Sequence, residues 1–197
     1  MAGAAAVALS GRVFSGSNVS DAVMTDCAEA IARATGAAIV PGTLNVWLDE
    51  PIALDNGRSA QVGKPRLAFW PAELDGLPVW IQRHDRGVLH VAELVADRRL
   101  RPALALADGD RVTLTLDPDL LVPIPWPGRL AWALFWRGRG RAGFVSPCYM
   151  RTARAWCRRL GATQDSVDAG SRRLLAGLIA EAVRAVTPRS TPRARSR

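Results

Sequence analysis

The stretch PGTLNVWLDEP, residues 41–51, says most about the fold of this chain. Pro41-Gly42 is a typical turn pair, and the residues after it alternate along the chain: Leu44, Val46 and Leu48 against Thr43, Asn45 and Trp47. A period of two places the first set on one face of a strand and the second set on the other. The stretch therefore predicts a half-buried β-strand that follows a tight turn.

Strand patterns recur on both sides of this stretch. Further strands are predicted over residues 7–14, 65–70, 77–82, 88–95 and 111–116, and the last of these follows the turn ADGD at residues 107–110. One clear helix interrupts the pattern, running from Ser20, a good N-cap, to about Thr35, with Gly36 as its stop. Many short strands with one inserted helix favour a mainly β fold, a small barrel, over a doubly wound sheet.

The second part of the chain has a different pattern. Residues 118–127 are proline-rich, and we place a boundary there, with a barrel over residues 1–118. Residues 119–186 are predicted to form an α-helical extension, with one helix beginning at Ser146-Pro147 and another over about residues 168–186. Residues 187–197 are arginine-rich, contain no residues able to form a core, and are predicted to be a disordered tail.

Charge is unevenly divided along the 197 residues, whose net charge is +8. Residues 1–119 hold 15 acidic and 11 basic residues, whereas residues 120–197 hold 3 acidic and 15 basic ones. The first domain is thus neutral to acidic, and its appendage is basic.

Composition places the chain among soluble globular proteins, since 49% of its residues are hydrophobic and 22% are charged. It lacks the long uncharged apolar run of a membrane span, and its apolar start is more typical of a first strand than of a secretory leader. The cysteines Cys27, Cys148 and Cys157 form neither a disulfide framework nor a zinc motif, so we expect a cytoplasmic protein.

Two polar residues of the 41–51 stretch could hold a metal ion. Thr43 and Asn45 lie two positions apart, so their oxygens point to the same side of a strand. A hydroxyl and an amide oxygen suit Mg²⁺, which keeps waters and takes further ligands from phosphates. The alternative, that they are the polar face of an ordinary half-buried strand, is favoured by the pattern alone.

The turn Ser15-Gly16-Ser17-Asn18-Val19-Ser20 stands before the predicted helix. Backbone amides of such a turn and of a helix N-terminus can bind phosphate without a charged side chain. The turn contains one glycine only, so an ordinary connection between strand and helix explains it equally well.

The segments PGTLNVWLDEP and AELVADRRLRPALALADGDRV, with the helix before the first, resemble the archaeal-type CTP-dependent riboflavin kinases. The resemblance covers about residues 7–117. It implies a six-stranded cradle-loop β-barrel that transfers the γ-phosphoryl group of CTP to the 5′-hydroxyl of riboflavin, giving FMN and CDP.

The resemblance also implies roles for individual residues. Thr43 and Asn45 match the family's Mg²⁺ ligands, and Glu93 matches the acidic residue on the flavin side, where it could orient the attacking hydroxyl or hold the flavin. The segment that contacts the nucleotide corresponds to Arg98, Arg99, Leu100 and Arg101. Nearby arginines would offset charge on the leaving diphosphate.

Two departures from the family pattern bear on these roles. The family's nucleotide loop is glycine-rich, whereas the matching residues here are Gly16, Ser17, Asn18, Val19 and Ser20. Side chains at the lost glycines could keep the backbone away from phosphate. Asp85 falls where the family has a threonine near the flavin, and another alignment would put His84 there.

The extension lies outside the resemblance. It combines Trp126, Trp132 and Trp136 with Arg137, Arg139 and Arg141, which are ingredients of nucleic-acid binding. A packed helix beside a solvated loop is the interpretation that we favour, and contact with a membrane surface is a third.

The sequence also gives expectations for two cysteines and two histidines. Cys148 and Cys157 are expected to be buried, and His84 and His90 to lie at the surface. Two classes of function besides the kinase stay open: a non-catalytic protein that binds flavin or nucleotide, and a nucleic-acid-binding protein that acts through the extension.

Overall fold

A computed structural model gives the structure of the protein. It describes residues 5–16, 20–63, 67–84, 87–139, 146–160 and 162–164, with the side chains of Ser20 and Asp21 left out. The predicted helix over residues 168–186 and the predicted tail over 187–197 lie outside the described residues.

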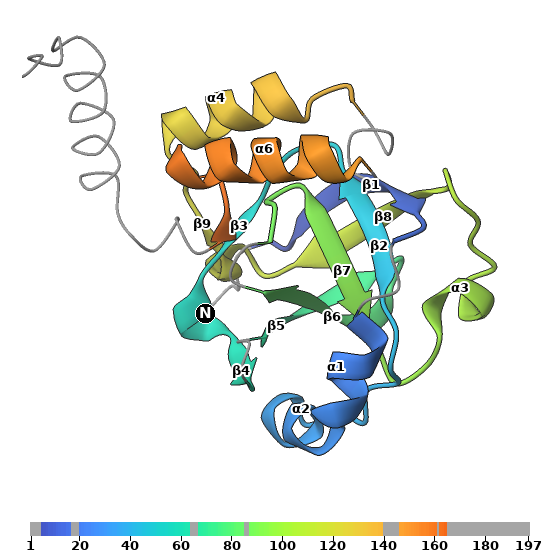
Figure 1. Ribbon diagram of the computed structural model, residues 1–197. Coiled ribbons are helices and arrows are strands. Elements are labelled where there is room, and N and C mark those ends of the chain that lie inside the picture. The colour runs from blue at the N-terminus through green and yellow to red at the C-terminus, as the bar shows by residue number, and fades with distance from the viewer. Residues whose placement is uncertain are drawn as a thin grey trace, which may run out of the picture.

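Six antiparallel strands form a closed barrel (Figure 1). They are β1 (Val7–Phe14), β2 (Leu44–Leu48), β5 (Leu67–Leu74), β6 (Leu77–His84), β7 (Val91–Val95) and β8 (Arg111–Leu116). Their order is β5-β6-β7-β2-β1-β8, and β8 pairs again with β5 through Glu73 opposite Thr115 and Leu74 opposite Leu114. The prediction of a mainly β barrel with few helices is therefore confirmed.

Three short strands add to the barrel. β4 (Ala60–Val62) extends the sheet beside β5, and β3 (Ala53–Leu54) pairs with β9 (Leu121–Val122) in a two-stranded sheet of its own. β9 lies beyond the proline boundary at residue 118, so the chain returns to the barrel before it forms the extension.

The barrel interior is apolar because alternate residues of each strand point inward. From β2, Leu44, Val46 and Leu48 are at most 4% exposed, and they pack with apolar residues of all the other barrel strands. Asn45 and Trp47, the residues between them, face outward and are half-buried. The alternation predicted for this strand is confirmed.

Two helices, α1 (Ser20–Asp26) and α2 (Ala28–Thr35), cover part of the outer face of the barrel. Met24 and Ile31 pack there against Phe69 and Val95. The sequence predicted one helix, but the chain breaks at Cys27, whose ψ of 6° is not helical. Gly36 ends α2 in the left-handed region, as expected of a glycine stop.

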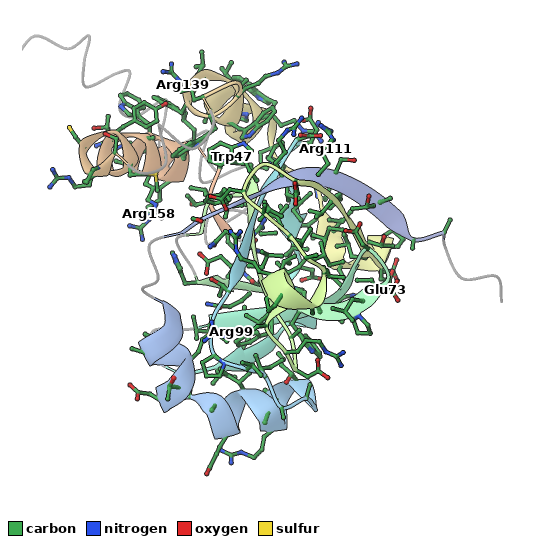
Figure 2. The ribbon with its side chains drawn as sticks, turned by 90° about the vertical axis from the view of Figure 1, so that its right-hand side faces the viewer. Trp47, Glu73, Arg99, Arg111, Arg139 and Arg158 are labelled. Atoms are coloured by element: carbon green, nitrogen blue, oxygen red, sulfur yellow. The ribbon has the colours of Figure 1, made fainter. Side chains whose placement is uncertain are left out.

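The extension forms two helices over another part of the outer face, α4 (Trp126–Phe135) and α6 (Pro147–Arg159). Figures 1 and 2 show them beside each other, with the barrel between them and α1–α2. Ser146 caps α6 by accepting a hydrogen bond from the backbone N–H of Tyr149, and Pro147 is its first residue, as predicted.

The extension packs on the barrel through an aromatic cluster that we call the tryptophan cluster: Phe14, Trp47, His90, Trp136 and Tyr149. The ring centroid of His90 lies 4.5 Å from that of Trp47 and 4.8 Å from that of Trp136. Figure 2 shows Trp47 next to the helices of the extension. Packing therefore continues from barrel to extension. Trp132 and Trp136 are buried, as the favoured interpretation expects, whereas Trp126 is exposed.

Short helices complete the described chain: a 3-10 turn at Asn56–Arg58, α3 (Leu100–Ala103), and a second 3-10 turn at Pro118–Leu120. Asp55 caps the first of these turns by accepting a hydrogen bond from the N–H of Gly57. In the part of the chain that the structure describes, no helix has the length and apolar character of a membrane span.

Two expectations about individual residues are wrong. His90 is 1% exposed rather than at the surface, because it fills the space between Trp47 and Trp136. Cys148 is exposed, whereas Cys157 is buried as expected. Trp156 of α6 is 45% exposed, and the guanidinium of Arg159 lies over its ring.

Candidate functional site

One end of the barrel gathers most of the residues that the sequence singled out, and we call it the site end. The end of β1, the start of β2, the end of β7 and the turn before β8 meet there, because antiparallel neighbours bring the end of one strand to the start of the next. A cavity of about 250 Å³ opens at this end. It is lined by Gly42, Thr43, Leu94, Arg98, Arg99, Leu100 and Arg101, among others.

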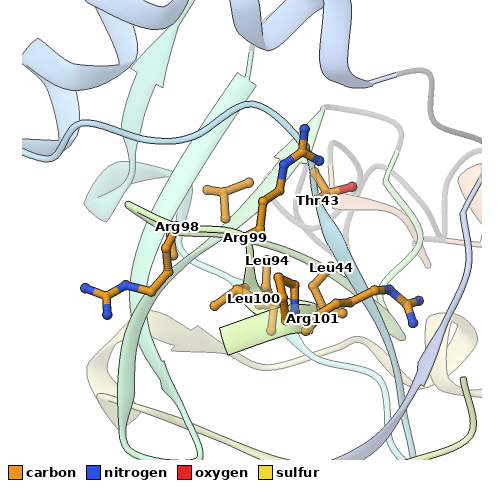
Figure 3. Close-up of a pocket in the computed structure, with 11 residues that line it drawn as sticks. Thr43, Leu44, Leu94, Arg98, Arg99, Leu100 and Arg101 are labelled. Carbon is orange, nitrogen blue, oxygen red and sulfur yellow. The ribbon is translucent and has the colours of Figure 1, made fainter. Parts of the chain in front are cut away.

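Arg99 lies closest to the turn that precedes β2. Gly42 has a φ of +114°, and a Cβ on it would overlap the guanidinium of Arg99. Figure 3 shows this guanidinium beside Thr43. A glycine at this point thus serves twice, since it permits the backbone conformation and leaves room for the arginine.

Arg98 and Arg101 are each engaged by a carboxylate. Arg98 donates to Asp97 at 2.7 Å, and in Figure 3 its side chain points away from Thr43. Arg101 donates to Asp108 at 2.7 Å. Leu100, between them, is 4% exposed and belongs to the barrel core, where it also lines the cavity.

Asp108 connects two parts of the site end. Besides the bond from Arg101, it accepts hydrogen bonds from the backbone N–H and the hydroxyl of Ser15, at 3.1 and 3.0 Å. Burial raises the pKa of Asp108, but the hydrogen bonds from Arg101 and Ser15 outweigh it and lower the pKa below its usual value. An ionised Asp108 thereby links α3 to the chain after β1.

Asn45 lies beside Gly16, next along the same edge. A Cβ on Gly16 would overlap the amide nitrogen of Asn45. Thr43 and Asn45 lie two residues apart, so the two side chains leave the strand on the same side. Thr43 lines the 250 Å³ cavity, whereas Asn45 is not among its lining residues.

These two residues fit a hard divalent cation in the chemistry of their oxygens, which are neutral. The space that a Cβ on Gly16 would need is occupied by the amide nitrogen of Asn45. Mg²⁺ accepts such a partial set because it completes its six ligands with water and phosphate oxygens. Elsewhere in the described residues, no three His, Cys, Asp or Glu side chains come together as a metal site.

Glu93 sits on β7 directly opposite Asn45 on one side and Gln82 of β6 on the other. Paired residues of antiparallel strands share a face, so the three side chains form one polar row on the outside of the barrel. The row runs between α1–α2 and the extension. The register thus places the side chains of Glu93 and Asn45 next to each other.

Two positively charged side chains act on Glu93, the middle residue of the row. Burial lowers the pKa of Arg83 to about 10, and the negative charge of Glu93 opposes that shift. The same two effects act on Arg154 of α6, whose pKa is lowered. Arg83 donates to the carbonyl groups of Ile52, Leu89 and Val91, so its charge is held in place.

Four of the predicted site residues cannot be placed with the others. Ser17, Asn18 and Asp85 lie outside the described residues, and for Ser20 the structure gives the backbone at the start of α1 only. His84, the alternative to Asp85, lies at the end of β6 and lines a small cleft with Glu93.

Sequence reasoning missed several residues of this region: Gln82, Arg83, Asp108 and Arg154. Gln82 is 2% exposed, and its Oε1 has no hydrogen-bond partner in the described parts of the chain. Only the register of β6 against β7 reveals it. Arg154 comes from a separate part of the sequence, so no local motif could connect it with Glu93.

Comparison with known proteins adds no family. No protein-family model matches the chain, and no curated protein matches it.

Proposed function

We propose that the protein is a CTP-dependent riboflavin kinase and that its barrel is of the cradle-loop type. The γ-phosphoryl group of CTP would pass to the 5′-hydroxyl of riboflavin, with FMN and CDP as products. The observation that carries the proposal is the arrangement at the site end, where Thr43, Arg99 and Arg101 line one cavity and Asn45 continues from it to Glu93.

The residues divide the work by chemistry. Arg99 and Arg101 would bind the phosphates of CTP, and Gly16 with the residues up to Ser20 would approach them through the backbone. Thr43 and Asn45 would hold Mg²⁺, which when bound neutralises charge on the phosphates. Glu93 would accept a hydrogen bond from the flavin substrate. Catalysis of this kind is mainly positioning and charge stabilisation. We place the activity in the cytoplasm, where nucleoside triphosphates are available.

One observation favours a second candidate, a non-catalytic protein that binds flavin or nucleotide. Arg98 and Arg101 already pair with Asp97 and Asp108, and two of the three glycines of the family's loop are replaced. Phosphates would have to compete with those carboxylates. Incubation with riboflavin, Mg²⁺ and each of the four nucleoside triphosphates separates the candidates: FMN formed with CTP supports the kinase, and flavin binding without FMN supports the alternative.

Asn45→Ala is the first prediction. It removes the amide oxygen but leaves the outward face of β2 otherwise unchanged, so FMN formation is expected to disappear while the far-ultraviolet circular dichroism spectrum is retained. Thr113→Ala, on an exposed position of β8, is the matched control and should retain full turnover. Undiminished turnover in Asn45→Ala would refute the metal assignment.

A further inference from the structure

The extension packs on the two strands that carry Asn45 and Glu93. Trp47 follows Asn45 by two positions and Val91 precedes Glu93 by two, so all four side chains lie on the outer face of the barrel. Trp47 and Val91 pack with Ala153 and Cys157 of α6. The extension therefore borders one side of the polar row.

Arg154 comes from the buried side of α6, next to Ala153, and is half-buried. Together with Glu93 it lines a small cleft of about 10 Å³, whose other lining residues are Arg83, His84, Gly87, Val88 and Val91. A cleft of this size holds about one water molecule. Two groups of opposite charge, Glu93 and Arg154, thus line the same small cleft.

The Nε of Arg154 is buried without a hydrogen-bond partner among the residues described. Burial lowers the pKa of Arg154, and the charge of Glu93 acts against that shift. A buried guanidinium N–H costs free energy unless a neighbouring group accepts a hydrogen bond from it. A carboxylate oxygen, reached directly or through one water, would satisfy it.

We propose that Arg154 is a positioning residue that orients the Glu93 carboxylate across this cleft, so that the extension forms one wall of the riboflavin side of the site. The inference rests on the proposed function for the role of Glu93 toward riboflavin. Arg154 acts on the flavin through Glu93 and has no part in binding CTP, because the nucleotide residues lie at the cavity beyond Asn45.

The groups facing Glu93 from each neighbouring element determine what Arg154 contributes. Asn45 faces it from β2, Gln82, Arg83 and His84 from β6, and Arg154 from α6. Arg83 is fixed by its bonds to backbone carbonyl groups, so it supplies charge from one direction. Arg154 supplies positive charge from the side of the extension and orients the Glu93 carboxylate.

Steady-state kinetics test the role of Arg154 in the full-length protein. Arg154→Met keeps the apolar stem and removes the charge, and it should raise KM for riboflavin about tenfold or more with KM for CTP changed less than about twofold. Arg154→Lys should recover part of the loss. Arg151→Met, on an exposed position of the same helix, should behave as wild type. Unchanged KM for riboflavin in Arg154→Met overturns the inference.

A second measurement does not depend on activity. The denaturation midpoints of Arg154→Met, Glu93→Gln and the double variant should be non-additive, with a double shift smaller than the sum of the single shifts. Additive shifts would show that the two groups do not interact, and would overturn the inference even if the protein is a kinase. If wild type forms no FMN with any nucleotide, the proposed function fails and the riboflavin role of Arg154 fails with it, whereas non-additive midpoints would still establish the contact.

Discussion

Two glycines control how close the functional side chains come to the backbone at the site end. Gly42 adopts a φ of +114° and makes room for Arg99, and Gly16 makes room for Asn45. The two positions differ in what a methyl group would do. Arg99 is long enough to shift its guanidinium, whereas Asn45 has a short side chain on a paired strand and less freedom to move.

Gly16→Ala is therefore expected to lower kcat for FMN formation by about tenfold or more, because the displaced amide of Asn45 no longer reaches the metal position. A loss of stability alone would leave the kcat of the folded protein unchanged. The control is Gly36→Ala, where φ is +71° and nothing lies within 4 Å of the added Cβ. That variant should lose about 1 kcal/mol of unfolding free energy and keep its turnover. Equal kcat values in the two variants would contradict the assignment.

At the scale of elements, the extension is attached by the inner faces of α4 and α6. Trp136 is 1% exposed, and its indole N–H donates to the sulfur of Cys157 at 3.1 Å. On the outer side of α4, Trp126, Leu130 and Leu134 are about half to two-thirds exposed. The buried tryptophan and the exposed one provide a direct comparison within one helical segment.

Trp136→Ala is expected to lower the free energy of unfolding by about 3–5 kcal/mol, since it leaves a large cavity between α6 and the barrel. Trp126→Ala should change it by no more than about 0.5 kcal/mol, because that side chain is 67% exposed. Chemical denaturation measures both. Similar losses in the two variants would mean that the extension is not held by its inner face.

The two cysteines of α6 should differ in reactivity. Burial raises the pKa of the Cys157 thiol to about 11, although the hydrogen bond from Trp136 acts in the opposite direction. Cys148 is exposed at the start of the same helix. An aromatic disulfide reagent at pH 8 should therefore modify Cys148 rapidly and Cys157 only after unfolding. Variants Cys148→Ser and Cys157→Ser identify each thiol, and rapid modification of Cys157 would contradict its buried position.

Sequence patterns predicted the barrel strands because each is five to eight residues long, and β2 and β8 bury alternate residues. They missed β3, β4 and β9, because strands of two or three residues are too short to show an alternation of apolar and polar residues. The break at Cys27 was also missed, since the apolar spacing continues across it. Thr43 and the arginines of 98–101 could be grouped in advance by their place in a motif, whereas Arg154 and Gln82 depend on tertiary packing.

For the whole molecule, the buried His90 couples acidity to stability. Its pKa is lowered to about 3, first by burial and then by the positive charge of Arg83. In the unfolded chain the same imidazole has a pKa near 6.5. Above that value the imidazole is neutral in both states and has no effect on stability. Below it only the unfolded chain takes up the proton, so the folded state loses stability down to about pH 3.

Between pH 7 and pH 5 the free energy of unfolding is expected to fall by about 2 kcal/mol through this one group. His90→Phe keeps a ring between Trp47 and Trp136 and cannot be protonated, so its stability should be nearly constant over that range. Denaturant titrations at several pH values measure the slope. The same slope in wild type and His90→Phe would show that another group is responsible.

The pairing of β1 with β8 joins Val7 to Leu116, nearly the full length of the barrel sequence. During synthesis the first strand leaves the ribosome long before the eighth, so one edge of it stays open for most of translation. The barrel cannot close until residue 116 has emerged from the ribosome. The side chain of Trp47 is covered later still, when α6 has been synthesised.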